Sequence, residues 1–120
     1  AADEQLNRHR AATKIIEDNA DKELEEVVKA AFPWAGTRPP TKEDVRLLRH
    51  ITDLYVAKQN GATVKDRQII SLPTRQRALW VQQQISGLEG EELNTKLLEL
   101  ARKRIYTEGV AQDLAELQQP

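Results

Sequence analysis

Apolar residues recur every three or four positions between Thr41 and Asn60, in the stretch TKEDVRLLRHITDLYVAKQN. This spacing places them along one face of an α-helix, in a stripe wide enough to contact a core on two sides. Thr41 is a favourable N-cap residue, and Asp44 three positions later can complete a capping box. Asn60 and Gly61 supply the left-handed turn with which helices commonly end. The members of the stripe are Val45, Leu47, Leu48, Ile51, Leu54 and Tyr55.

Helical periodicity also covers both ends of the chain. Residues 3–31 predict one long N-terminal helix, and a break at Asn19 that leaves two shorter helices is the alternative. Residues 89–118 predict one long C-terminal helix, in which Gly109 favours a kink or a break. Two shorter helices are expected after the central one, the first capped by Thr63 and the second over residues 75–86. The sequence therefore predicts an all-α fold, a compact bundle of four to five helices with long N- and C-terminal helices.

With 120 residues the chain is expected to form one domain, and its aromatic content of 4% favours helices over a β-rich core. Its predicted parts are an N-terminal helical region (1–32), a loop containing Pro and Trp (33–40), central basic helices (41–87) and a C-terminal helix (88–120). Phe32 and Trp34 are large apolar side chains at this loop. They can fold back to close the end of the core. They can also anchor a partner protein, because an aromatic on a proline-stiffened loop loses little entropy on binding.

Charge is distributed unevenly, although the formal net charge is only -1. Residues 45–85 contain seven Lys and Arg against two Asp and Glu, whereas the segments on both sides are acidic. Because Lys and Arg neutralise phosphates, this basic segment is a candidate nucleic-acid interface. Its candidate contact residues are Arg46, Arg49, Lys65, Arg67, Gln68, Arg75 and Arg77. The alternative interpretation is an ordinary solvated surface paired with the neighbouring acidic segments.

The segment around Gly61 resembles, in part, the turn of a helix-turn-helix. Ala57 is small enough to let two helices approach, Gly61 four residues later turns the chain, and Thr63 can cap the next helix. Asn60 and Arg67 depart from this pattern, because apolar packing residues are expected at their positions. A helix-turn-helix is therefore one form that a nucleic-acid site in this segment could take.

Catalytic and metal sites lack the residue patterns that would support them. The chain has no cysteine, and therefore no disulfide, thiolate nucleophile or cysteine metal site. His9 and His50 lie on different predicted helices, and we expect each to be exposed or packed against a helix rather than paired. No nucleophile motif or phosphate-binding glycine loop is present. We therefore predict a protein that is not an enzyme, with no cofactor and no metal.

The predicted function is that of a non-catalytic helical assembly or adaptor module that acts through protein–protein contacts. The two terminal helices are longer than a compact bundle requires, and this surplus length favours a protein partner or self-association. Phe32 and Trp34 are the candidate partner-binding residues, and nucleic-acid binding through residues 45–85 is the alternative function. No uncharged apolar run is long enough to span a bilayer, so we expect a soluble protein without membrane insertion. The compartment stays open between the cytoplasm, which is slightly favoured, and processing for export.

Overall fold

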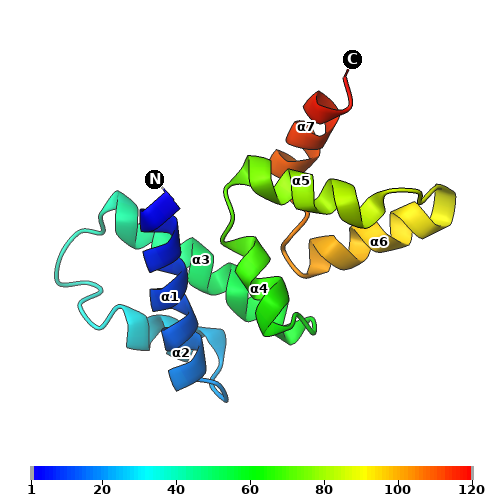
Figure 1. The fold of residues 1–120 in the computed structure, drawn as a ribbon. Coiled ribbons are helices and arrows are strands. Elements are labelled where there is room, and N and C mark those ends of the chain that lie inside the picture. Colours follow the sequence, from blue (N-terminus) through cyan, green and yellow to red (C-terminus); the bar gives the residue numbers. More distant parts are fainter. Residues whose placement is uncertain (1, 120) are drawn as a thin grey trace.

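The computed structural model describes residues 2–119, and every regular element in this part of the chain is an α-helix (Figure 1). The all-α prediction is confirmed, but residues 2–119 form seven helices rather than four to five. They are α1 (Ala2–Asp18), α2 (Leu24–Ala31), α3 (Lys42–Gln59), α4 (Val64–Ile70), α5 (Thr74–Ile85), α6 (Gly90–Arg102) and α7 (Glu108–Leu117).

The helices form two groups, α1 to α4 and α5 to α7, that meet near the middle of the molecule (Figure 1). In the first group α1 packs most extensively on α3, and α2 and α4 also contact α3. In the second group α5 packs most extensively on α7 and also contacts α6. The molecule measures 51 × 30 × 20 Å, and its radius of gyration is 15.8 Å, against about 14 Å for a compact domain of this length. The fold is thus more extended than the compact bundle that the sequence predicts.

The N-terminal helical region breaks at Asn19, so the two-helix alternative is correct and the single long helix is wrong. The side-chain amide of Asn19 donates a hydrogen bond to the main-chain carbonyl of Ile15, with an N···O distance of 2.8 Å. This local bond competes with helix continuation, which is why Asn favours helix ends over helix interiors. Because the chain turns here, both α1 and α2 contact α3.

The predicted C-terminal helix also consists of two helices, and the break lies before Gly109 rather than at it. α6 ends in a Schellman motif. The Ile105 amide donates to the Leu100 carbonyl (2.9 Å), and the Arg104 amide donates to the Ala101 carbonyl (3.0 Å). Arg104 occupies the left-handed position of the motif, with φ 62°. Leu100 and Ile105 are both buried, so an apolar pair fixes this reversal of the chain.

The central helix begins and ends as the sequence predicts. The Thr41 hydroxyl accepts a hydrogen bond from the Asp44 amide, and the Asp44 carboxylate accepts one from the Thr41 amide. Gly61 follows the helix with φ 88°. The same capping box recurs at the start of α4, between Thr63 and Asp66. These caps satisfy amides that the first turn of a helix leaves without main-chain partners.

The apolar stripe of α3 is buried along one edge and exposed along the other. Ile51 and Leu54 are at most 1% exposed and belong to the main core. Val45 and Leu48, by contrast, are 49% and 37% exposed. The expectation that the whole stripe contacts a core is therefore wrong at this outer edge, because the neighbouring helices cover only part of the stripe.

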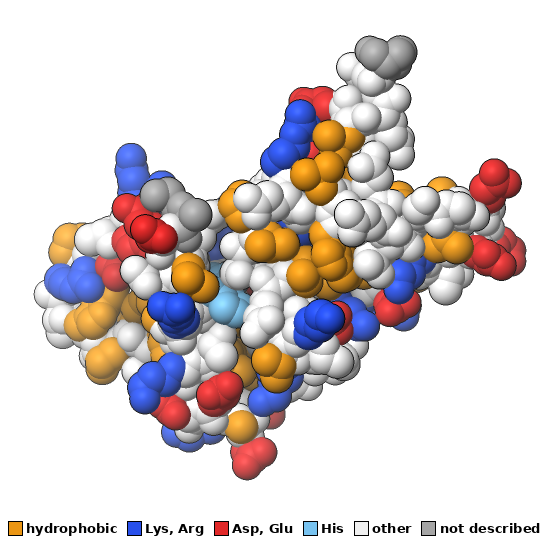
Figure 2. Space-filling view, viewed as in Figure 1, with side chains coloured by type: hydrophobic (Ala, Val, Ile, Leu, Met, Phe, Trp, Pro, Cys, Tyr) orange, Lys and Arg blue, Asp and Glu red, His pale blue; other side chains and the backbone are white. Residues whose placement is uncertain are grey.

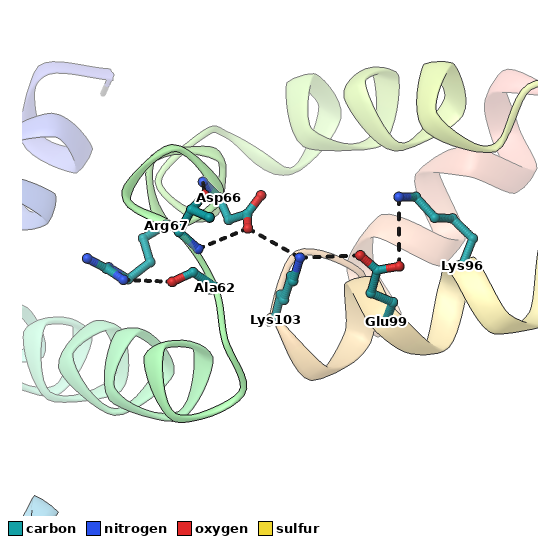
Figure 3. A network of polar contacts seen from close by, with 7 residues as sticks. Ala62, Asp66, Arg67, Lys96, Glu99 and Lys103 are labelled. Carbon is teal, nitrogen blue, oxygen red and sulfur yellow. Dashed lines mark hydrogen bonds and ion pairs between the residues drawn. The ribbon is translucent and has the colours of Figure 1, made fainter.

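An ionic network connects α4 with the end of α6, and so joins the two groups of helices (Figure 3). The Lys103 ammonium lies 3.3 Å from a carboxylate oxygen of Asp66 and 3.3 Å from one of Glu99. Burial alone would lower the pKa of Lys103, but its hydrogen bonds to Glu99 and Asp66 outweigh that effect and raise the pKa. Asp66 is thus both a member of the α4 cap and the partner of Lys103.

We expect Ile51→Ala to lower the free energy of unfolding by about 2–5 kcal/mol, because it leaves a cavity in the core. Leu48→Ala is the matched control, since it removes a side chain of the same size from an exposed position. That variant should lose less than about 1 kcal/mol. Urea unfolding followed by circular dichroism measures both changes. Equal losses would contradict the division of the α3 stripe into a buried and an exposed edge.

Arg104→Gly should raise the free energy of unfolding by about 1 kcal/mol, because glycine adopts a positive φ without the steric penalty of a side chain. Gly61→Ala is the opposite change at the equivalent position after α3, and should lower that free energy by about 1 kcal/mol. Thermal and urea unfolding measure both. If Arg104→Gly were less stable than the original chain, the Arg104 side chain would contribute more than its backbone conformation costs.

Candidate functional site

An apolar groove lies between the end of α2, the following loop and the start of α3. Its volume is about 250 Å³, and its accessible surface is almost entirely apolar. Arg38 and Asp44 add charged groups to its lining. The apolar side chains that line it are Val28, Phe32, Trp34, Pro40, Val45 and Leu48. Residues 33–40, which the sequence predicts to be a loop, therefore form one wall of this groove.

The two loop aromatics occupy different environments. Phe32 is only 7% exposed and packs edge-to-face on Trp34, with ring centroids 5.5 Å apart. The Arg38 guanidinium lies 3.4 Å from the centroid of the Trp34 ring, and also binds Asp44 at an N···O distance of 3.0 Å. The Thr41 amide and then Arg38 hold the pKa of the Asp44 carboxyl below its ordinary value. Phe32 thus belongs to the core, while the partly buried Trp34 faces the groove in a fixed position.

Two histidines meet where α1 packs on α3. The Nδ1 atom of His9 lies 3.0 Å from the Nε2 atom of His50, and the ring centroids are 5.2 Å apart. One ring must donate an N–H and the other accept it, so a single proton lies between the two nitrogens. The expectation that the histidines are unpaired is therefore wrong. No local signal in the sequence indicates this pair, because 41 positions separate its members.

The surroundings of the histidine pair disfavour the imidazolium form. His9 is 8% exposed, and burial together with the nearby Arg67 guanidinium lowers its pKa. Burial, followed by the charges of His9 and Arg8, lowers the pKa of His50 to about 4. Both rings are therefore mainly neutral at pH 7. Figure 2 shows histidine atoms in a hollow near the middle of the face that it presents.

A second concave surface, the arginine depression, adjoins His50 and has a volume of about 170 Å³. Its lining comes from α1 (Arg8), α3 (Arg46, Arg49, His50 and Asp53), α4 (Ile70) and α5 (Arg77). The structure thus brings together three residues of the predicted nucleic-acid interface, which are Arg46, Arg49 and Arg77. It adds Arg8, which charge counting along the chain misses because Arg8 lies in the acidic N-terminal segment.

The other residues of the predicted nucleic-acid interface lie elsewhere. Arg67 and Gln68 line a separate depression of about 270 Å³. Arg75 forms an ion pair with Glu116 of α7, at an N···O distance of 3.1 Å. Lys65 is exposed on α4. These four residues therefore lie outside the lining of the arginine depression.

The turn between α3 and α4 has some of the features of a helix-turn-helix. Ala57 is fully buried, Gly61 has φ 88°, and Thr63 caps α4. However, α4 has only seven residues. The Arg67 guanidinium also donates a hydrogen bond to the Ala62 carbonyl at 2.8 Å, so that it is engaged by its own turn (Figure 3).

No family model, curated protein or solved structure matches this chain. Within residues 2–119, His, Asp and Glu side chains do not gather in a group of three or more that could hold a metal ion. In the same part of the chain, no helix combines the length and the apolar character needed to cross a membrane. Among the concave surfaces, the apolar groove has an almost wholly apolar lining and the arginine depression has four guanidinium groups.

Lowering the pH from 7 to 5 should decrease the free energy of unfolding by about 2 kcal/mol through His50 alone. The pKa of His50 is about 4 in the folded chain and about 6.5 in the unfolded chain. Between these values the unfolded chain binds more protons, so stability falls as the pH decreases. His50→Gln keeps a hydrogen-bonding group toward His9 and should reduce this pH dependence. Urea unfolding at both pH values measures it, and an equal dependence in both proteins would contradict a neutral buried His50.

Proposed function

We propose that this protein is a non-catalytic docking module that binds an amphipathic helix of a partner protein in the apolar groove. The observation that carries this proposal is the exposure of Val45 (49%) and Leu48 (37%) inside a groove that also contains Trp34. Large apolar side chains gathered on a concave surface are typical of sites that bind other proteins. Such a groove can recognise a helix through shape and apolar contact, without catalysis.

The spacing of the apolar side chains in the groove suits a helical ligand. Val45 and Leu48 are three residues apart on α3, so they are neighbours on one face of that helix. Trp34 and Pro40 extend the apolar surface onto the loop. A partner helix with apolar residues at positions i, i+3 or i+4, and i+7 can insert one or two of them into a groove of about 250 Å³. The remaining apolar residues of that helix would cover the rim of the groove.

The groove is also preorganised. Trp34 packs against Phe32 and lies under the Arg38 guanidinium before any partner binds. Arg38 is itself held by its ion pair with Asp44. Side chains that are already ordered lose little rotamer entropy when a partner arrives, and this favours affinity.

The charges at the start of α3 favour acidic residues on the partner helix. Glu43 and Asp44 are already bound to Arg8 and Arg38. Lys42 precedes them, is exposed, and takes no part in the ion pairs among residues 2–119. An apolar helix face bordered by Asp or Glu would therefore complement this end of the groove.

The sequence suggests a partner from the length of the terminal helices, whereas the structure suggests one from the exposed edge of α3. The surplus length predicted for the terminal helices is absent from the structure, because α1 has 17 residues and α6 has 13. Helix length therefore no longer supports self-association. The exposed edge of the α3 stripe supports a partner instead, because it leaves apolar surface that a partner can bury.

Selection of a displayed library of helix-forming peptides on the full chain should yield sequences with apolar residues at three- and four-residue spacing and acidic flanks. Val45→Glu should weaken a selected peptide about tenfold or more, because it places a carboxylate in the apolar groove. Val64→Glu is the matched control, since Val64 is 59% exposed on α4 and lies outside the groove. Anisotropy of a labelled peptide measures both affinities, with circular dichroism to confirm folding.

Three results would overturn the proposal. The first is a selection that yields no binding peptide, and the second is an equal loss of affinity in Val45→Glu and Val64→Glu. The third is a dimer of the protein alone that light scattering detects and that Val45→Glu dissociates. That result would identify a second copy of this chain as the occupant of the groove.

A further inference from the structure

Beyond docking at the apolar groove, we propose that the arginine depression binds a phosphate group, held chiefly by Arg49 and Arg77 beside His50. The depression is lined by α1, α3, α4 and α5, whereas the groove is lined by α2, the loop and α3. The two sites therefore use different residues.

The lining of the depression carries four guanidinium groups and one carboxyl group, that of Asp53. Glu43, outside the lining, partly neutralises two of the four. It accepts two hydrogen bonds from Arg8, at 2.9 and 3.2 Å, and lies 3.6 Å from Arg46. Arg49 and Arg77 form no ion pair among residues 2–119. Each pair of arginines thus has one carboxyl group nearby, but Asp53 lies outside ion-pair distance of Arg49 and Arg77, whereas Glu43 binds Arg8 directly.

Arg77 is partly buried and has no ion-pair partner among the described residues. One of its terminal nitrogens donates to the Ile70 carbonyl at 2.9 Å, while its Nε is buried and has no hydrogen-bond partner. Burial lowers the pKa of Arg77, and Asp53 only partly opposes this effect. The rest of the guanidinium lines the depression, where an anion would stabilise its partly desolvated charge.

Asp53 is a weak counter-ion for these arginines. Burial raises the pKa of its carboxyl group, although Arg104, Arg77 and Arg49 oppose the shift. The carboxylate form is therefore less favourable here than in water, and Asp53 makes no ion pair within 4 Å among the described residues. The depression consequently retains an excess of positive charge that an external anion can neutralise.

The geometry suits a phosphate better than a single carboxylate. Phosphate offers several charged oxygens in different directions, and guanidinium groups bind such oxygens in a fork geometry. Here the guanidinium groups come from three separate helices. A volume of about 170 Å³ equals that of roughly five or six water molecules, enough for one phosphate group and its remaining water. The rest of any larger ligand would lie outside the depression.

The phosphate could belong to a small molecule or to a nucleic-acid backbone, and one experiment separates these sources. The full chain, labelled with ¹⁵N, is titrated with inorganic phosphate, with pyrophosphate and with a short single-stranded DNA. Chloride keeps the ionic strength constant, because non-specific phosphate contacts weaken with salt. Saturable shifts of the α3 amides near Arg49 and His50 are expected. An upward shift of the imidazole titration of His50 should accompany them, since a bound anion favours the charged ring.

Arg49→Gln should weaken phosphate binding about tenfold, because it removes a charged donor from the site without emptying the core. Arg75→Gln is the matched control. Arg75 lies near the start of α5, as Arg77 does, but it forms an ion pair with Glu116 outside the depression. This variant should leave the affinity unchanged. Val45→Glu, in the apolar groove, should also leave it unchanged, so that the two proposals fail or succeed separately.

The outcomes are distinct. DNA that competes with phosphate, and whose affinity falls in Arg49→Gln, would support a nucleic-acid backbone as the source. Binding of phosphate or pyrophosphate without competition by DNA would support a small phosphorylated ligand. The proposal is overturned if none of the three probes gives a saturable shift near His50, or if Arg75→Gln loses as much affinity as Arg49→Gln.

Discussion

Burial of one edge of α3 is the constraint on which the rest of the structure depends. Ile51, Leu54 and Ala57 are at most 1% exposed, and α1, α2 and α4 all contact this helix. The small side chains of Ala57 and, on α1, Ala12 are both fully buried, which suits the close approach of helices. Because most of the first group packs on one helix, the positions of the loop and of the histidine pair follow from how α3 is buried.

Since only one edge of α3 is buried, its other faces line both the apolar groove and the arginine depression. Val45 and Leu48 open into the apolar groove, while Arg46 and Arg49 open into the arginine depression. One rigid helix therefore holds an apolar and a cationic surface in a fixed relation to each other. A ligand that binds the folded chain at either surface would also stabilise α3, because binding to the native state alone shifts the folding equilibrium.

The sequence predicts the structure correctly where it is decided locally, as in the capping box of α3, the Thr63 cap of α4 and the glycine turn between these helices. The end of α6 carries no such signal, because Arg104 favours helices and the break depends on the burial of Ile105. Periodicity likewise assigns Val45 and Ile51 to one stripe, but it does not indicate how much of that stripe other helices cover. The histidine pair and the arginine depression require tertiary contacts, which no spacing along the chain encodes.

Polar side chains of α1, α3 and α5 line the arginine depression together. Arg77 has a buried Nε without a partner, and replacement of buried ionic groups by apolar residues is often neutral or stabilising. A domain of this size has a stability of only about 5–15 kcal/mol, so the partial desolvation of the Arg77 charge is a cost that matters. An anion beside Arg77 would remove much of that cost. Because Arg77 belongs to α5 and Arg49 to α3, an anion bound by both would connect the two groups of helices, as the ion pair between Lys103 and Asp66 does.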